Sequence, residues 1–384
     1  MEALRFNGSG SEYFKIWIVN MLLMVITLGI YYPWAKVRNR RYFYNNTSLD
    51  KKKFEYHATG KQLFIGFIIA ISLLVIYNTL GVTNSLFGGL FLFLFILALP
   101  WLIWKSLTFN MKMTSFSDVH FSFDGRLGKI YGIFLGYPLL FLLSLSLMGM
   151  LFSLMMPVIH TINPNVMAVV GLIVAILGII AYLYIFAFIK KKSIEYFIEN
   201  SHYGQGIFKT ELETTKFFTI LLKALTLVLL LIALVSIFIR SFSDISGLSY
   251  AIGANGSISG EELLFTFAYF MMIFILVVII AYLKTRERTY IYENTILDNN
   301  IAFESTLRAR VLAWVMLSNI FLVLITFGLA FPWAKVRVTR LMLEHTLVDT
   351  EVGFDDYITQ KQEEVSALAD QIGDLFDLDA DMTF

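Results

Sequence analysis

The chain has 384 residues, of which 58% are hydrophobic and 15% charged, with a net charge of +1 and no cysteine. An ordinary soluble domain carries about 25% charged residues, so this composition excludes a typical water-soluble protein. The absence of cysteine excludes disulfide bonds, thiolate metal sites and cysteine nucleophiles.

Eight apolar stretches follow one another along the chain. A helix that crosses a bilayer needs about 20 mainly apolar residues, and an open sheet edge in lipid would leave backbone groups unpaired. The sequence therefore predicts an all-α fold, a polytopic helical membrane protein with six to eight membrane segments. The stretches lie at about 14–32, 62–82, 86–104, 130–156, 166–189, 217–239, 263–283 and 311–331.

The longer connections between these stretches are rich in Lys, Arg and aromatic residues, whereas most of the others are short and nearly uncharged. By the positive-inside rule, the basic connections face the cytoplasm. The six central stretches then form three helical hairpins whose tips lie on the opposite side of the membrane.

A sequence motif recurs near the two ends of the chain. Residues 20–50 align without a gap with residues 319–349, and the hexapeptide Pro-Trp-Ala-Lys-Val-Arg occupies both 33–38 and 332–337. Weaker copies lie in the other basic connections, so a fixed unit is repeated. The copies predict a membrane domain over residues 1–350 with about five units, followed by an acidic tail over 351–384. The connections of the units lie near 33–61, 100–129, 190–216, 284–310 and 332–357.

The motif places an indole ring and several cations where a helix leaves the hydrocarbon. Three tryptophans, Trp34, Trp101 and Trp333, are predicted interface anchors. Two polar residues inside the membrane segments, Asn20 and Asn319, are costly there unless they find hydrogen-bond partners. The cations either anchor helix ends and set topology, or form a cytoplasmic collar that binds anionic lipid or solute. The predicted binding residues are Lys36, Arg38, Arg41, Lys284, Arg286, Arg288, Lys335, Arg337 and Arg340.

These residues carry a resemblance to a known family. The patterns Ile16-Trp17-x-x-Asn20, Thr27-Leu28-Gly29, Tyr32 to Arg38, Asn46-Thr47 and Phe54 to His57 resemble the YjgN family of bacterial inner-membrane proteins. The resemblance covers most of the chain. It implies a multi-pass protein of the bacterial inner membrane without an assigned activity. The connection with Lys190 to Lys192 lacks Pro-Trp and departs from the motif, which argues against a role that needs five equal sites.

Motifs of catalysis and of metal binding are absent from the sequence. The five histidines are scattered without metal-ligand spacing, and neither a phosphate-binding loop nor a nucleophile elbow occurs. We therefore expect a non-enzymatic protein without catalytic residues, metal or cofactor. Its expected partners are anionic membrane lipids rather than nucleic acid. The alternative is a transporter or channel with a pathway near the terminal repeat units. A polar pathway lined by Asn20 and Asn319 would favour that alternative, whereas dry packing there would favour lipid engagement.

The two terminal membrane segments present a conflict of topology. If 14–32 and 311–331 both cross the membrane, their identical basic motifs face opposite sides, which the positive-inside rule disfavours. Gly29 and Gly328, each four residues before a proline, are suitable places for a helix to break. We favour re-entrant segments with both termini cytoplasmic. The competing interpretation is that both segments cross and the acidic tail is translocated.

The acidic tail contains one apolar face at helical spacing. A short amphipathic helix that docks on the positive connections and a solvated, disordered tail are both compatible with this pattern. The face consists of Val365, Leu368, Ile372, Leu375 and Phe376.

Overall fold

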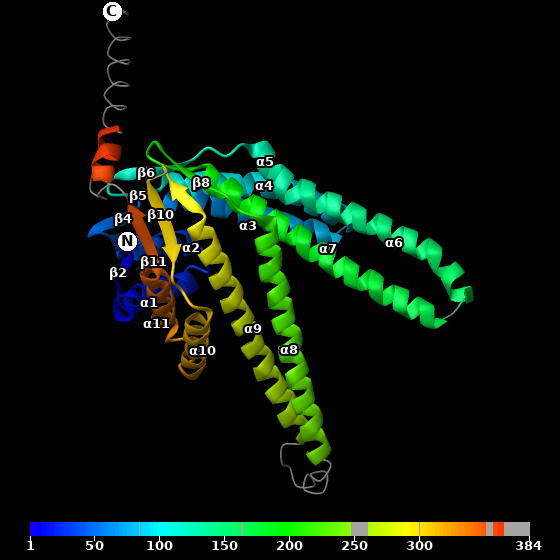
Figure 1. Cartoon of the computed structure of the whole chain (residues 1–384). Helices are drawn as coiled ribbons and strands as arrows, with labels where there is room; N and C mark the ends of the chain where they lie inside the picture. Colours follow the sequence, from blue (N-terminus) through cyan, green and yellow to red (C-terminus); the bar gives the residue numbers. More distant parts are fainter. Residues whose placement is uncertain (84, 163, 247–259, 299, 351–355, 365–384) are drawn as a thin grey trace, which may run out of the picture.

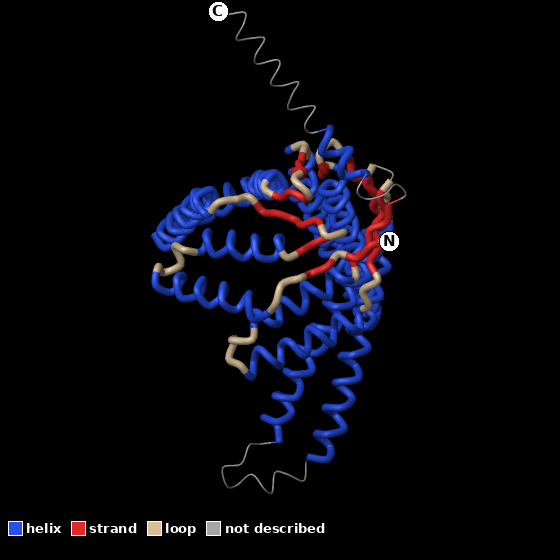
Figure 2. The backbone as a smooth tube through the Cα atoms, turned by 90° about the vertical axis from the view of Figure 1, so that its left-hand side faces the viewer, coloured by secondary structure: helices blue, strands red, loops and turns tan. Residues whose placement is uncertain are grey.

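The computed structural model describes the chain except for residues 84, 163, 247–259, 299, 351–355 and 365–384. Its described part combines long helices with one eleven-stranded antiparallel sheet, and the strands lie together at one end of the helices (Figure 2). The prediction of an all-α fold is therefore wrong. The connections pair their backbone groups with one another and form strands. The strands are β1 (Glu2–Ala3), β2 (Arg5–Phe6), β3 (Thr47–Leu49), β4 (Lys52–Tyr56), β5 (Thr114–Phe116), β6 (Val119–Phe123), β7 (Ser201–Tyr203), β8 (Gly206–Thr210), β9 (Thr295–Leu297), β10 (Ile301–Ser305) and β11 (Thr346–Thr350).

Tight hairpins form because the sequence supplies both a helix stop and a turn. At the first turn, Asp50 and Lys51 have φ angles of 46° and 65°. Two successive residues with positive φ give a turn whose twist matches that of the flanking strands. Where the second helix of each sector leads into the last strand, a hydroxyl on the first residue of that strand donates to the carbonyl four residues earlier and satisfies a free group at the helix end. These hydroxyl residues are Thr47, Thr114, Ser201, Thr295 and Thr346.

The sheet closes on itself through the N-terminus. β1 pairs with β11 and β2 pairs with β3, so the two ends of the strand order are joined by Leu4. The Leu4 N–H donates to the Thr346 carbonyl at 3.0 Å. The chain thus forms five sectors around a ring, each built as strand, helical hairpin and strand. Sectors 1 to 5 comprise residues 2–49, 52–116, 119–203, 206–297 and 301–350.

Helices leave the ring in pairs, one pair for each sector. Sectors 1 and 5 hold short helices, and sectors 2, 3 and 4 hold long ones, with a π-helical turn at Gly132–Gly136 in sector 3. The helices are α1 (Gly10–Ile26), α2 (Tyr32–Asn45), α3 (Gly60–Thr83), α4 (Ser85–Lys112), α5 (Leu127–Tyr131), α6 (Tyr137–Ile162), α7 (Pro164–Glu199), α8 (Thr214–Ser246), α9 (Gly260–Glu293), α10 (Ala309–Ile325) and α11 (Phe331–Glu344).

The long pairs supply the membrane-spanning part. Six helical segments in the described part of the chain are long and apolar enough to cross a bilayer, and at most 17% of any such segment is buried inside the protein. The pairs α6/α7 and α8/α9 leave the sheet in diverging directions (Figure 1). Neighbouring sectors pack through α2 against α3, α4 against α5, α7 against α8, α9 against α10 and α11 against α1. The helices therefore close a ring in the same order as the strands.

The terminal helices break at the predicted glycines. After α1, Leu28 and Gly29 have φ angles of 49° and 88°, and after α10, Phe327 and Gly328 have 48° and 89°. The Gly29 N–H donates to the Met24 carbonyl at 2.7 Å, the hydrogen bond of a helix end with glycine in the left-handed conformation. The chain then returns to the sheet through α2 and α11. All five sectors consequently begin and end on the same side of the molecule.

A short helix over residues 356–364 packs against one opening of the ring. Its Tyr357 and Ile358 are buried against one apolar side chain from the last strand of every sector. Its Lys361 forms an ion pair with Asp298 at 2.9 Å. The predicted apolar face of the tail, Val365 to Phe376, lies outside the described residues. The five side chains under this helix are Leu49, Phe116, Tyr203, Leu297 and Val348.

Candidate functional site

The tryptophans of the repeated hexapeptide join neighbouring sectors. Trp34 covers Gly60 at the start of α3, and Trp333 covers Gly10 at the start of α1; a Cβ atom at either glycine would overlap the indole ring. Each indole also packs on a phenylalanine that lies one turn after the covered glycine, Phe64 in α3 for Trp34 and Phe14 in α1 for Trp333. Trp101, the third predicted anchor, is 43% exposed on α4. The motif thus has a structural role between sectors, and the anchoring of these residues at the membrane interface stays a prediction.

Two arginines of the repeated segment form a second contact between the same pairs of sectors. Arg41 donates to the Ala58 carbonyl at 2.8 Å, and Arg340 donates to the Gly8 carbonyl at 2.9 Å. Both carbonyls lie two residues beyond the strand that opens the next sector, β4 for Ala58 and β2 for Gly8. The contact from Arg340 therefore closes the ring between sectors 5 and 1 in the same way that Arg41 joins sectors 1 and 2.

The two intramembrane asparagines have partners within their own sectors. Arg38 donates to Asn20 Oδ1 at 3.3 Å, and Arg337 donates to Asn319 Oδ1 at 3.0 Å. Asn20 is 1% exposed and Asn319 is 7% exposed. Neither asparagine lines any of the three cavities described below. The hydrogen bonds connect the two helices of each terminal hairpin.

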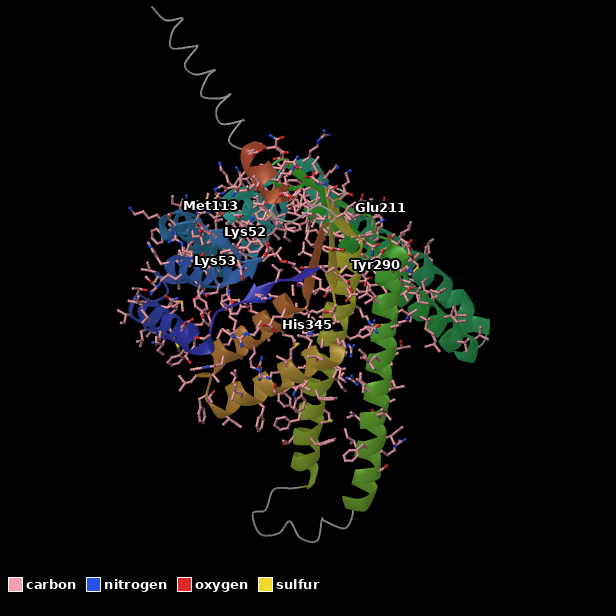
Figure 3. The ribbon with its side chains drawn as sticks, turned by 60° about the vertical axis from the view of Figure 1, so that its left-hand side comes forward. Lys52, Lys53, Met113, Glu211, Tyr290 and His345 are labelled. Carbon is pink, nitrogen blue, oxygen red and sulfur yellow. The ribbon has the colours of Figure 1, made fainter. Side chains whose placement is uncertain are left out.

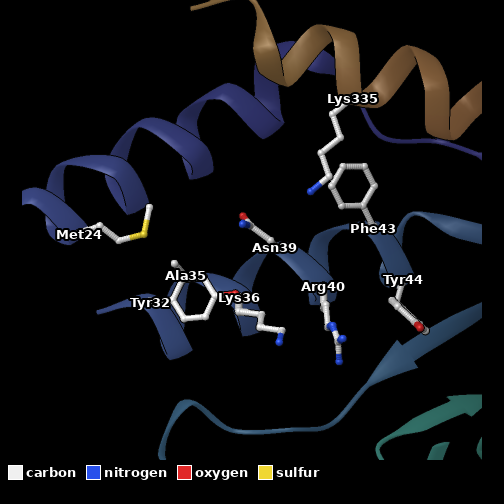
Figure 4. Close-up of a pocket in the computed structure, with 9 residues that line it drawn as sticks. All are labelled: Met24, Tyr32, Ala35, Lys36, Asn39, Arg40, Phe43, Tyr44 and Lys335. Carbon is white, nitrogen blue, oxygen red and sulfur yellow. The ribbon is translucent and has the colours of Figure 1, made fainter. Parts of the chain in front are cut away.

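A cationic pocket lies between the terminal sectors. It has a volume of about 320 Å³ and is lined by α1, α2 and α11. Lys36 and Arg40 line it from α2, and Lys335 lines it from α11, reaching toward Phe43 and Asn39 (Figure 4). The remaining lining residues are Met24, Tyr32, Ala35, Asn39, Phe43 and Tyr44. Three cations thus line this pocket, and no carboxylate is among its nine lining residues.

Burial makes the charges in this pocket costly. Burial lowers the pKa of Lys36, and the nearby Arg40 lowers it further. Burial also lowers the pKa of Lys335, whose Nζ donates to Tyr13 Oη at 3.1 Å and lies 4.6 Å from the centre of the Phe43 ring. The phenol and the aromatic faces compensate for burial in part, because both interact favourably with a cation. An anion placed among the three cations would raise the pKa of both lysines.

The other predicted cations do not enter this pocket. Lys284 and Arg286 are exposed near the end of α9. Arg288 reaches sector 5, where it donates to the Met342 carbonyl at 3.1 Å and lies over the Tyr292 ring. The structure therefore brings Lys36 and Lys335 together and leaves the remaining predicted binding residues distributed around the ring.

Sequence reasoning did not select Arg40 as a binding residue. Arg40 lies one residue before the predicted Arg41 and occupies the same repeat position as the predicted Arg288, so the alignment of the copies contained the signal. In the structure it donates to Tyr56 Oη at 2.8 Å and to Asn110 Oδ1. It also lines both the cationic pocket and a larger cavity.

The larger cavity lies on the axis of the ring. Its volume is about 850 Å³, and its walls come from α2, α4, α7, α9 and the seven strands β4 to β10. A third cavity, of about 700 Å³, lies beside sector 4 and has four glutamates in its lining; Figure 3 labels two residues that line it, Glu211 and Tyr290. Within the described ranges, no group of three His, Asp or Glu side chains is placed to hold a metal ion.

The fold and its six long apolar helices define an integral membrane protein. The chain belongs to the family described as bacterial protein of unknown function (DUF898), which matches residues 1–375. A protein from Salmonella typhimurium named inner membrane protein YjgN is 29% identical over 91% of this chain and 89% of its own length. Proteins of the same name from Escherichia coli O157:H7 and K12 are 27% and 26% identical, each over 89% of this chain and 87% of their own length. The resemblance to the YjgN family is confirmed, and no solved structure matches.

Proposed function

We propose that the protein is a non-enzymatic membrane protein that binds an anionic ligand, a lipid headgroup or a solute, in the cationic pocket between its terminal sectors. The observation that carries the proposal is that Lys36, Arg40 and Lys335 line one pocket that has no acidic lining residue. Cations that are desolvated without a counter-charge lower stability, and a bound anion removes that cost. The proposed binding site is thus this one pocket rather than the whole collar of basic connections.

We infer that the sheet side of the molecule faces the cytoplasm. All five sectors start and end at the sheet, so the basic connections share one side, and the positive-inside rule assigns that side to the cytoplasm. The terminal hairpins then enter the membrane from the cytoplasmic side and return. Relatives named inner membrane proteins support the inner membrane as the location.

The test is mass spectrometry of lipids and small molecules that remain on the purified protein. We expect enrichment of an anionic species, and its loss from the variant Lys36→Gln/Lys335→Gln. Each charge near an anionic group contributes about 1 kcal/mol, so two charges should lower retention about thirtyfold. The matched control is Lys15→Gln/Lys61→Gln, which removes two exposed lysines near the helix starts. Equal retention by both variants would contradict the proposal.

The alternative is transport through a pathway near the terminal sectors. It is favoured by one observation, that the cationic pocket and the axial cavity share Arg40 and Tyr44 in their linings. Proteoliposomes loaded with the retained species distinguish the two functions. Protein-dependent exchange across the membrane would establish transport, and retention without exchange supports a binding role.

A further inference from the structure

We propose that the ligand is an anionic amphiphile, with its charged headgroup in the cationic pocket and its acyl chain in the axial cavity. This inference rests on the proposed function and adds the chemical class of the ligand. It starts from the lining of the axial cavity, which is dominated by apolar and aromatic side chains. Cavities of this size and composition are typical of sites for small organic molecules.

One apolar side chain from each of the five sectors contributes to a layer across the axis of the ring. The middle residue of the first strand in sectors 2 to 5 belongs to it, as does Leu4 between β1 and β2 in sector 1, and all five are partly buried against the core of the sheet. The rings of Phe208 and Phe303 stack at 6.2 Å between centroids. The four phenylalanines also line the axial cavity. The layer consists of Leu4, Phe54, Phe121, Phe208 and Phe303.

Beyond this layer, the axis is filled. The buried side chains from the last strand of each sector, which lie under the helix of residues 356–364, form the next layer, with Tyr357 and Ile358 packed on them. The cavity is thus closed toward the sheet by two apolar layers and a helix. An acyl chain that enters the cavity therefore ends against apolar side chains and does not emerge into water.

Most hydroxyl groups in the cavity wall have partners within the protein. Ser193, Thr114, Ser201 and Thr295 each donate to a carbonyl four residues earlier in the preceding helix. They therefore present mainly their carbon atoms to the cavity. A polar solute would lose water there and gain few hydrogen bonds, which is unfavourable. An acyl chain loses nothing of that kind and gains dispersion contacts.

The two cavities meet at Arg40 and Tyr44, which line both. Arg40 is held over the Tyr56 ring, 5.2 Å from its centre, and so marks the boundary between the cationic and apolar parts. A ligand that fills both parts must carry negative charge at one end and hydrocarbon at the other. Fatty acids and lysophosphatidates share this chemistry.

The test uses photoactivatable palmitate with a diazirine near the end of its chain, added to the purified full-length protein in nanodiscs of zwitterionic lipid. Cross-linked residues are mapped by mass spectrometry. We expect labels on cavity residues such as Phe121, Ile198 and Phe208. A lysophosphatidate with the same photoactivatable chain forms a second arm, and stronger labelling in one arm identifies the headgroup as carboxylate or phosphate.

Cavity-filling variants make the test specific. Ile194→Trp and, independently, Leu107→Trp place an indole in the axial cavity. Labelling of the cavity residues should therefore fall to the level found without photoactivation. The control Ile173→Trp adds an indole on an exposed part of α7 and should label like the wild type. The second filling variant keeps the test decisive if the first does not fold.

The outcomes separate this inference from the proposed function. Loss of anion retention in Lys36→Gln/Lys335→Gln, with labels confined to the outer faces of the long helices and no effect of the filling variants, overturns the acyl-chain site and leaves the headgroup site standing. Unchanged retention and unchanged labelling in Lys36→Gln/Lys335→Gln overturns the proposed function itself. Labels in the cavity that disappear with either filling variant support the amphiphile.

Discussion

Replacing Asp298 by Asn should release the helix of residues 356–364 from the ring. Asn tolerates the left-handed backbone at this position, where φ is 52°, and its amide oxygen can still accept from Ile207 N at 2.8 Å. The change therefore removes the charge without removing the turn. What it takes away is the carboxylate that accepts from Lys361 and from the Tyr357 hydroxyl, each at 2.9 Å.

The magnitude follows from the surroundings of Lys361, whose side chain is 8% exposed. Breaking a buried ion pair on one side costs about 3–5 kcal/mol. Lys361 keeps a second partner, Glu364, at 3.0 Å, and Asp298 is 22% exposed. We therefore expect a loss below this range, about 2 kcal/mol, in the free energy of helix docking. That is about a thirtyfold increase in the undocked population.

Hydrogen exchange of the backbone amides in residues 356–364 measures this population, because amides exchange when the helix opens. The control is Glu364→Gln, which removes the more exposed partner of Lys361 and should accelerate exchange much less. Equal exchange in the wild type and in Asp298→Asn would refute the reasoning, because the ion pair would then not hold the helix.

The same contact predicts a pH dependence. Burial raises the pKa of Asp298, but the hydrogen bonds from Ile207, Lys361 and Tyr357 outweigh it, so the pKa lies below the ordinary value of 3.8. A carboxylate with a lowered pKa stabilises the docked state above its unfolded pKa, and this stabilisation is lost as the pH falls through the folded pKa. Exchange of residues 356–364 should therefore accelerate in acid below pH 3.8, and Asp298→Asn should abolish the acid step.

Three further predictions concern the ring and its orientation. Gly60→Ala places a methyl group against the indole of the preceding sector and should destabilise the protein by about 1–3 kcal/mol, whereas Gly66→Ala, with open space at its Cβ, should not lower the melting temperature. Asn319→Ala removes the acceptor of a guanidinium that stays partly hydrated, so a loss of about 1 kcal/mol is expected in chemical denaturation. Single cysteines at Asp118 and Gly81 should react with an impermeant thiol reagent from opposite sides of the membrane, and labelling of both from one side would contradict the proposed orientation.

The long helices were predictable from sequence because hydropathy over about 20 residues is a strong signal. The breaks at Gly29 and Gly328 were also readable, since glycine followed by proline interrupts a helix through local chemistry alone. The sheet was missed for a physical reason. Its strands have two to five residues, too short for alternation to stand out among basic and aromatic neighbours, although Val119 to Phe123 does alternate in polarity.

The cationic pocket was only half visible in the sequence. The repeat selected Lys36 and Lys335, but their proximity depends on α11 packing against α1 and on the closure of the ring. That closure requires the strand of residues 2–6, whose partner β11 lies at the other end of the chain. No local pattern reports such a pairing. The role of Arg38 and Arg337 as partners of buried asparagines was likewise hidden, because composition alone cannot distinguish a cation that faces headgroups from one that turns inward.

Closure of the ring by its first strand has a consequence for biogenesis. β2 finds its partner β3 as soon as sector 1 has been made, but β1 must wait for β11. Synthesis proceeds from the N-terminus, so every nascent chain carries two unpaired strand edges until residues 346–350 emerge. Unpaired edges invite pairing with other chains. A truncation before β11 therefore does more than remove one strand of the sheet: it leaves an open sheet that is prone to aggregate, a substrate for quality control in the cell.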